Sequence, residues 1–172
     1  MYCKYIFCLP PSCPSPTLLA AMHLSAYSDY AMRVLIHTAL RQPQRVTVRE
    51  VATTFGISRH HLVKIVHELG RRGYLTTHRG LGGGFTLAQP AEEIRVGAIV
   101  RLGEQGPTVI DCQDGANRCC RLRAVCQLKA VLDEAAAAFF AVLDRYSLAD
   151  LLAHPRRMSV VLGLLPADGR AE

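Results

Sequence analysis

The segment 47–72, TVREVATTFGISRHHLVKIVHELGRR, decides the fold. Thr47 and the glutamate three positions later form a capping-box pattern, which predicts a short helix over 48–55. Gly56 then supplies a tight turn before a second helix over 60–72. The apolar positions of both helices recur at the spacing of a shared core. This arrangement is typical of the helix-turn-helix, whose second helix enters the major groove of DNA.

The start of that second helix holds the candidate DNA contacts. Ser58 is placed to cap the helix, and basic side chains crowd its first two turns. Arginine can donate two hydrogen bonds to a guanine edge, whereas lysine and a helix N-terminus favour phosphate. An ordinary solvated helix surface is the alternative. We expect DNA contacts from Ser58, Arg59, His60, His61 and Lys64.

A glycine-rich turn, RGLGGG at 79–84, follows between two expected strands at 73–77 and 85–87. Glycines let the backbone approach a neighbouring surface, and an arginine beside them can enter a narrow minor groove. No Gly-Lys-Ser/Thr follows and no helix begins there, which argues against a nucleotide-binding P-loop. The pattern predicts a β-wing. Its candidate DNA contacts are Arg79, Gly80, Gly82 and Gly83.

Further helices are expected on both sides of this unit. Amphipathic spacing predicts a helix over 25–40 and a connecting helix over 91–103. A long helix follows, and at ~1.5 Å per residue it makes a rod of about 30 Å. A chain this small can hardly cover such a rod, so we expect a two-fold homodimer that presents two reading heads to a palindromic site. The apolar stripe of the rod consists of Leu122, Val125, Leu128, Leu132, Ala135, Phe139 and Val142.

Composition and charge agree with a DNA-binding module joined to a second part. The chain has 172 residues, 50% apolar and 20% charged, which fits one compact domain and excludes wholesale disorder. Residues 22–90 carry a net charge of +6, whereas 91–172 carry −1. A basic half suits a polyanion partner. No stretch approaches the ~20 apolar residues of a membrane-spanning helix, so no membrane partner is expected.

The ends of the chain are expected to be unstructured. Four prolines interrupt the first 21 residues, unlike a secretory signal, and a second methionine stands at the start of the helical pattern. The expected organisation is an extension or misassigned start (1–21), the winged helix-turn-helix (22–90), a linker helix with a cluster-binding loop (91–120), a dimerisation helix (121–152) and a flexible tail (153–172).

Four cysteines lie within 15 residues: Cys112, Cys119, Cys120 and Cys126. Thiolates bind soft ions, in zinc, copper(I) and iron–sulfur sites. Zinc sites usually show two close cysteine pairs, whereas here two cysteines are adjacent and the other gaps are seven and five residues. The spacing favours an iron–sulfur centre over zinc, with a ligand position left for another residue. A redox disulfide and unliganded thiols remain alternatives.

These features together resemble the winged-helix transcription regulators that include NsrR and IscR. The resemblance covers residues 22 to about 152, and within the family it is greatest for the NsrR type. The segments that carry it are LSAYSDYAMR (24–33), ISRHHLVKIV (57–66), RGLGGG (79–84), the cysteine loop and DRYSLADL (144–151).

The resemblance implies a mainly α fold with a small β-wing, followed by a cysteine loop and a long dimerisation helix. It also implies a 4Fe–4S rather than a 2Fe–2S cluster, held by Cys112, Cys120, Cys126 and Asp29 of the partner subunit. IscR-type members place a histidine ligand where this chain has Lys129, which cannot bind metal while protonated. The first cysteine gap is longer than is common in the family, and Cys119 is the alternative to Cys120.

The function implied is that of a cytoplasmic repressor, not an enzyme. The dimer would bind a palindromic operator, and nitric oxide would react with the cluster and release the DNA. One alternative is a regulator of the same fold that senses iron or cluster supply. Another is an iron–sulfur electron carrier whose basic half binds an acidic partner. No nucleophile and base stand at a catalytic spacing in the sequence.

Overall fold

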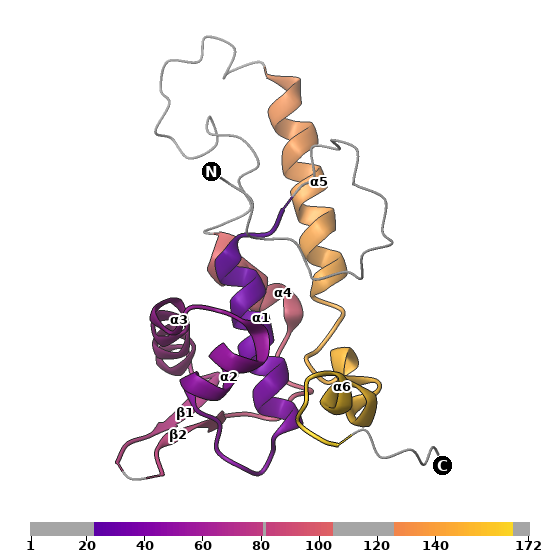
Figure 1. The fold of residues 1–172 in the computed structure, drawn as a ribbon. Helices are drawn as coiled ribbons and strands as arrows, with labels where there is room; N and C mark the ends of the chain where they lie inside the picture. Colours follow the sequence, from indigo (N-terminus) through magenta and orange to yellow (C-terminus); the bar gives the residue numbers. More distant parts are fainter. Residues whose placement is uncertain (1–22, 81, 105–125, 167–172) are drawn as a thin grey trace, which may run out of the picture.

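The computed structural model describes residues 23–80, 82–104 and 126–166. Predictions that fall on 1–22, 81, 105–125 and 167–172 lie outside the described residues. The described chain is mainly helical with one antiparallel hairpin, as expected (Figure 1). Its elements are α1 (Ala26–Leu40), α2 (Val48–Phe55), α3 (Arg59–Arg71), β1 (Leu75–His78), β2 (Gly84–Leu87), α4 (Val96–Glu104), α5 (Gln127–Leu143), the 3-10 turn η1 (Asp150–Leu152) and α6 (Pro155–Val161).

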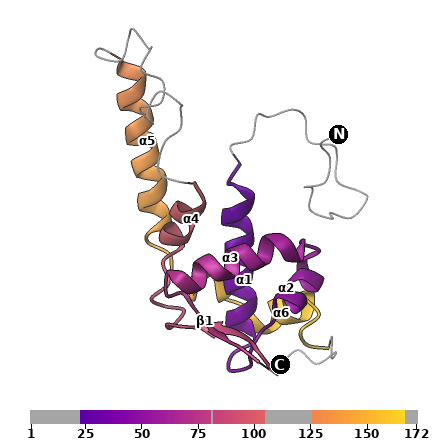
Figure 2. The ribbon, with the colours of Figure 1, turned by 90° about the vertical axis from the view of Figure 1, so that its left-hand side faces the viewer.

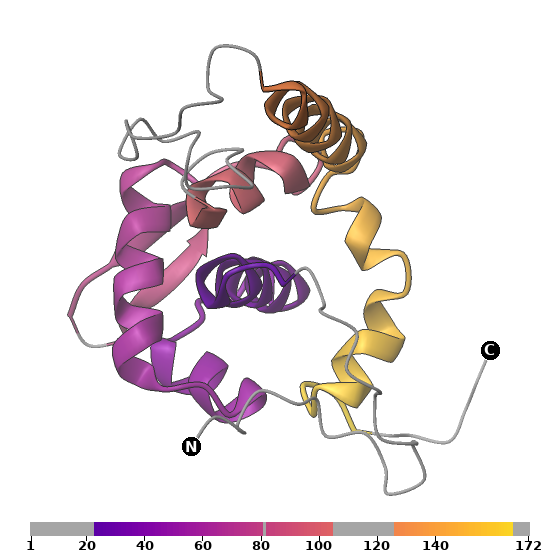
Figure 3. The same cartoon turned by 90° about the horizontal axis from the view of Figure 1, so that it is seen from above.

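Helix α1 is the centre of the molecule. Seen from above, the other helices surround it (Figure 3). Ala31, Val34 and Leu35 of α1 are completely buried in the main apolar core, together with side chains of α2, α3, the hairpin and α4. Helix α1 is therefore packed directly against the helix-turn-helix.

The helix-turn-helix forms as its sequence predicts. The capping box at α2 is complete: the Glu50 backbone N–H donates to Thr47 Oγ1 at 3.2 Å, and the Thr47 N–H donates to Glu50 Oε2 at 2.6 Å. Gly56 ends α2 in the left-handed conformation, with φ of +64°. Ser58 occupies the cap position of α3, but its hydroxyl makes no capping hydrogen bond. The expected side-chain cap is therefore absent there.

The hairpin pairs Leu75 with Leu87 and His78 with Gly84. Val46, just before α2, adds a third short segment: its N–H and C=O both bond Phe85, at 2.9 and 2.8 Å. A side chain at Gly84 would place Cβ 2.6 Å from the Val46 oxygen, so this contact requires glycine. The wing is thereby tied to the start of α2.

The connecting helix is shorter than predicted. It was expected from residue 91, but α4 begins at Val96. The first residue of α4 and the residues before it pair with the segment after α5. The Val96 N–H donates to the Tyr146 oxygen at 3.0 Å, and the Leu148 N–H donates to the Ile94 oxygen at 2.8 Å. Local periodicity could not reveal this pairing, because the two segments are about fifty residues apart in sequence.

Helix α5 projects away from the rest of the chain. Figures 1 and 2 show its N-terminal end beyond α1 and its C-terminal end beside α4. Among its residues only Ala136 and Phe140 are buried. The Arg101 guanidinium fixes this end, because it donates two hydrogen bonds of 2.6 Å to the Asp144 carboxylate and stacks 4.5 Å above the Phe140 ring.

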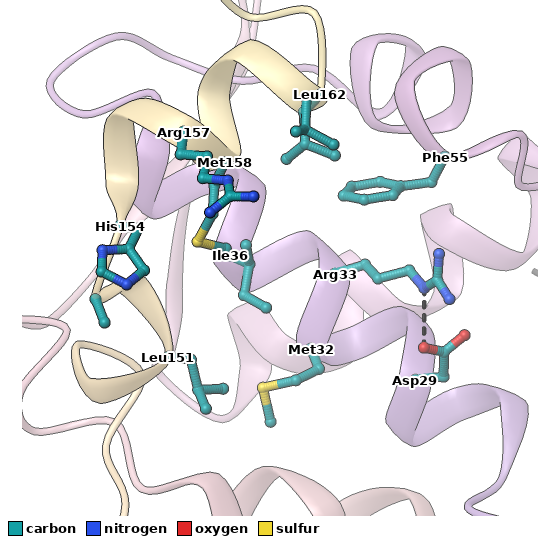
Figure 4. A pocket seen from close by; sticks show the side chains of 12 residues that line it. Asp29, Met32, Arg33, Ile36, Phe55, Leu151, His154, Arg157, Met158 and Leu162 are labelled. Atoms are coloured by element: carbon teal, nitrogen blue, oxygen red, sulfur yellow. Dashed lines mark hydrogen bonds and ion pairs between the residues drawn. The ribbon is translucent and has the colours of Figure 1, made fainter. Parts of the chain in front are cut away.

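The segment expected to be a flexible tail contains a helix. Helix α6 forms within it, with proline at its start and Ser159 buried. It lies across a cavity from α1, and Met158 and Leu162 line this cavity together with Met32 and Ile36 (Figure 4). Across 23–80, 82–104 and 126–166, no helix is long and apolar enough to cross a bilayer.

Candidate nucleic-acid interface and cluster site

Helix α3 divides into a buried and an exposed side. Leu62, Ile65, Val66 and Leu69 are buried in the core. Arg59, His60 and Lys64, three of the expected DNA contacts, are exposed. Figure 2 shows α3 and the hairpin on the same face of the molecule. The structure thus brings the predicted recognition helix and wing to one surface.

His61 has a second role beside its expected one. Its ring stacks on Tyr30 of α1, with centroids 6.4 Å apart and planes 23° from parallel. Tyr30 is buried, whereas His61 is exposed. His61 therefore links the recognition helix to α1.

The glycines of the wing serve the turn itself. Gly80 and Gly82 have φ of +91° and +74°, which side chains rarely adopt. A Cβ at Gly83 would lie 2.7 Å from the His78 oxygen. The turn itself therefore requires glycine at these positions. For this reason the glycines support a DNA contact less strongly than the sequence pattern alone indicates.

Arg45 is a residue that sequence reasoning missed. Its guanidinium donates to the Gly82 oxygen at 3.3 Å, which places a positive charge beside the wing. The wing itself carries the exposed Arg79. Only the pairing of Val46 with Phe85 brings Arg45 there. Its one sequence signal was membership of the basic half.

Asp29, the predicted fourth cluster ligand, lies in the first turn of α1. Its carboxylate is 45% exposed and accepts a 2.9 Å hydrogen bond from Arg33 Nε, one turn later (Figure 4). The preceding residue, Ser28, is fixed differently. Its hydroxyl bonds Glu104 Oε1 at 2.6 Å, and Glu104 also accepts from the Ser25 N–H at 2.8 Å. Glu104 is the last described residue before the segment that holds Cys112, Cys119 and Cys120.

Cys126 is the one predicted cysteine ligand within the described residues. It is a half-buried free thiol at the cap position of α5. Cys112, Cys119 and Cys120 lie outside the described residues. No group of three potential ligands occurs in the described part of the chain. The donor set of thiolates with one accessible carboxylate fits an iron–sulfur centre chemically.

An apolar cavity of about 620 Å³ lies beside Asp29, between α1 and α6. Met32, Ile36, Phe55 and Met158 line it, and the Asp29–Arg33 pair stands at its edge (Figure 4). Arg33 also lies 5.5 Å above the Phe55 ring. The carboxylate is thus reachable from outside while its neighbours hold α1 against α2.

Comparison with known proteins identifies the family. A family model described as Rrf2, iron-dependent transcriptional regulator, matches residues 24–154. The chain belongs to the Rrf2 family. Rrf2 proteins are transcriptional regulators, so this member is a regulator rather than an enzyme.

Several relatives of this Rrf2 protein share one name. The HTH-type transcriptional regulator NsrR of Bacillus subtilis is 42% identical over 132 residues, which cover 76% of this chain and 90% of the relative. That of Geobacillus kaustophilus is 45% identical with the same coverage. The predicted NsrR-type resemblance is confirmed at this level.

Solved structures of the family confirm the fold. IscR from T. potens is 26% identical with a TM-score of 0.58, over 77% of this chain and 88% of that structure. CymR from Staphylococcus aureus is 28% identical with a TM-score of 0.59, over 76% and 98%. The winged-helix prediction is therefore right.

Proposed function

We propose that this Rrf2 protein is a DNA-binding repressor whose iron–sulfur cluster senses nitric oxide. The observation that carries the proposal is the exposed basic side of α3 next to the wing, in a chain 42% identical to a regulator named NsrR. Arg59, His60 and Lys64 would enter the major groove, and Arg79 the adjacent minor groove. Ser58, Gly80, Gly82 and Gly83 would approach the phosphates.

The same proposal includes a cytoplasmic homodimer. Leu128 of α5 is 58% exposed, and Val142 on the same stripe is 44% exposed. Phe140, which packs against Val96 and Val100 of α4, lies on a different side of the helix. A second copy that covers the stripe would remove this apolar area from water and bring two reading heads to one palindromic operator.

The proposed cluster ligands are Cys112, Cys120 and Cys126, with Asp29 of the partner subunit. When bound, a 4Fe–4S cluster supplies iron that reacts with nitric oxide. The position of Cys126 supports a fourth ligand from the partner subunit. Cys126 precedes the first turn of α5, and this end of the helix projects beyond α1 (Figure 1). In this role the Asp29 carboxylate would give up its hydrogen bond to Arg33 and would bind the cluster of the partner subunit instead.

Within one subunit, α1 connects this ligand to the DNA-binding surface. Asp29 is adjacent to Tyr30, whose ring stacks on His61 of α3. Ser28, on its other side, bonds Glu104 at the border of the cysteine segment. Without its bond to the partner's cluster, Asp29 would leave α1 free to shift, and α3 would move with it. The spacing of the two reading heads would then no longer match the operator.

The test is an anaerobic preparation with iron and sulfide counts and an absorption spectrum. We expect the wild type to carry about four of each per subunit at full loading of a 4Fe–4S cluster. Cys120→Ser and Cys126→Ser should lose the cluster, whereas Cys119→Ser, the matched control, should keep it. A wild type that carries zinc, or Cys126→Ser protein with a full cluster, would contradict the proposal.

A sensor of iron or cluster supply is the second candidate. The description of the matched family as iron-dependent favours it. Titration with an iron chelator separates the two. A supply sensor has a more labile cluster and should release DNA at low chelator concentrations. A nitric-oxide sensor should remain bound to DNA at the same concentrations.

A further inference from the structure

One exposed apolar side chain stands among the basic residues of the recognition helix. Val63 is 55% exposed, whereas Leu62 before it is completely buried. With 3.6 residues per turn, Val63 lies one turn after Arg59 and one turn before His67, both exposed. The fold does not use this side chain in its core.

Val63 lies toward the wing rather than toward α1. Gly70, seven residues later and so on nearly the same side of α3, is next to β1: a Cβ there would lie 3.6 Å from Thr77 Cγ2. His61 is on the α1 side, where it stacks on Tyr30. Figure 2 shows α3 running above β1 on this face.

Helix propensity does not explain the valine. A β-branched residue loses side-chain freedom in a helix, so alanine would form α3 more readily at an exposed position. The surroundings instead fit a ligand with a negative backbone and an apolar group. Glu68, an acid on α3, is engaged by Arg72 at 2.8 Å and Arg71 at 3.6 Å, which leaves Arg59 and Lys64 to set the local charge.

Duplex DNA has this combination. Its phosphates are negative, and the C5-methyl of thymine is the apolar group that a base pair presents in the major groove. We propose that Val63 is a specificity-determining residue that contacts a thymine methyl in each operator half-site. This inference rests on the proposed DNA binding and adds a named base to it.

The test uses duplexes selected from random sequence by the anaerobically purified full-length protein. Each thymine is then replaced by uracil, which removes only the methyl group. At one position per half-site we expect wild-type affinity to fall about fourfold, since burial of one methyl group contributes about 0.8 kcal/mol. Val63→Ala should bind the thymine and uracil duplexes equally. Val161→Ala, a control at another exposed valine (78%), should keep the wild-type ratio.

Two results overturn the inference alone: tight wild-type binding without any thymine–uracil difference, or a Val63→Ala variant that keeps the difference. If no duplex is selected, the proposed function fails and the inference fails with it. The substitution leaves the core untouched, and an unchanged thermal transition confirms that Val63→Ala is folded.

Discussion

At the scale of single residues, Gly103 shows how closely α4 approaches α1. A Cβ at this position would lie 2.8 Å from the Ser28 backbone nitrogen and would collide with the Ser28 hydroxyl. The sequence pattern predicts that the connecting helix ends at Gly103 and that a loop follows. In the structure the residue lies within α4, and its lack of a side chain lets Ser25 and Ser28 reach Glu104.

Gly103→Ala should therefore lower the free energy of unfolding by about 1–3 kcal/mol, the usual cost of overpacking. Gly70→Ala is the matched control, because its Cβ meets only ordinary contacts at 3.6 and 3.7 Å. Better helix propensity should leave it unchanged or up to about 1 kcal/mol more stable. Denaturant unfolding of both variants checks this, and equal stability of the two would contradict the packing described.

His37 gives the molecule a pH dependence. The residue is 1% exposed, Nε2 lies 3.3 Å from Thr54 Oγ1, and Nδ1 has no hydrogen-bond partner among the described residues. Burial lowers the pKa of His37 in the folded state, against the opposing charge of Glu50 and with the help of Arg41. The neutral form is therefore the one that the fold holds.

Below the ordinary histidine pKa of about 6.5, the unfolded chain takes up a proton at His37 that the folded chain does not. The free energy of unfolding should therefore decrease as the pH falls from about 6.5 toward the lowered pKa of His37 in the folded state. Denaturant unfolding at pH 7.5 and 5.5 should show a smaller decrease for His37→Gln than for the wild type. The same decrease in both would mean that His37 is not the group responsible.

At the scale of elements, α3 is the proposed recognition helix. Arg59→Ala should weaken operator binding and relax discrimination at one base pair by about 1–3 kcal/mol. Arg156→Ala removes the same charge at an exposed position of α6 and is the control. Affinities for the operator and its single-base variants, measured at fixed salt, decide the matter. If both variants lose the same affinity for every base-pair variant, Arg59 contributes only its charge and does not read a base.

The apolar stripe of α5 belongs to the same scale. Leu128→Glu should raise the dimer dissociation constant about a hundredfold or more, because burial of an unpaired charge costs several kcal/mol. Ala130→Glu adds the same charge to the opposite side of the helix, at another exposed position. Sedimentation analysis should find monomer only in the first variant. Dimers of equal stability in both would place the interface elsewhere.

Elements with strong local signals were predictable from the sequence. The capping box at Thr47, the turn at Gly56 and the amphipathic spacing of α1 all formed as predicted. Local patterns failed where distant segments decide the structure, as at Ile94, which was expected within the helix over 91–103 but pairs with Leu148. Helix α6 was missed because a seven-residue helix carries little periodicity of its own.

The candidate site was predictable only in part, for the same reason. Basic residues adjacent in sequence, such as Arg59 and His60, pointed to α3 without any structure. Arg45 could not be found, because a tertiary pairing brings it to the wing. Asp29 came from family resemblance alone, since an acid in the first turn of a helix is commonly explained by the helix dipole.

At the scale of the whole molecule, the proposed switch consists of the partner's cluster, α1 and the two reading heads. A preference of ~1.5–3 kcal/mol for DNA in the cluster-bound form is enough for tenfold to hundredfold control. Within one subunit, the contacts of Asp29, Ser28 and Tyr30 would transmit the state of the cluster to α3.

The most direct test measures operator affinity of the anaerobic, cluster-loaded dimer before and after nitric oxide, with the cluster spectrum recorded on the same samples. We expect a tenfold to hundredfold weaker complex once the spectrum shows nitrosylation. Unchanged affinity after complete nitrosylation would contradict the proposed switch, as would equally tight binding by protein that never held iron.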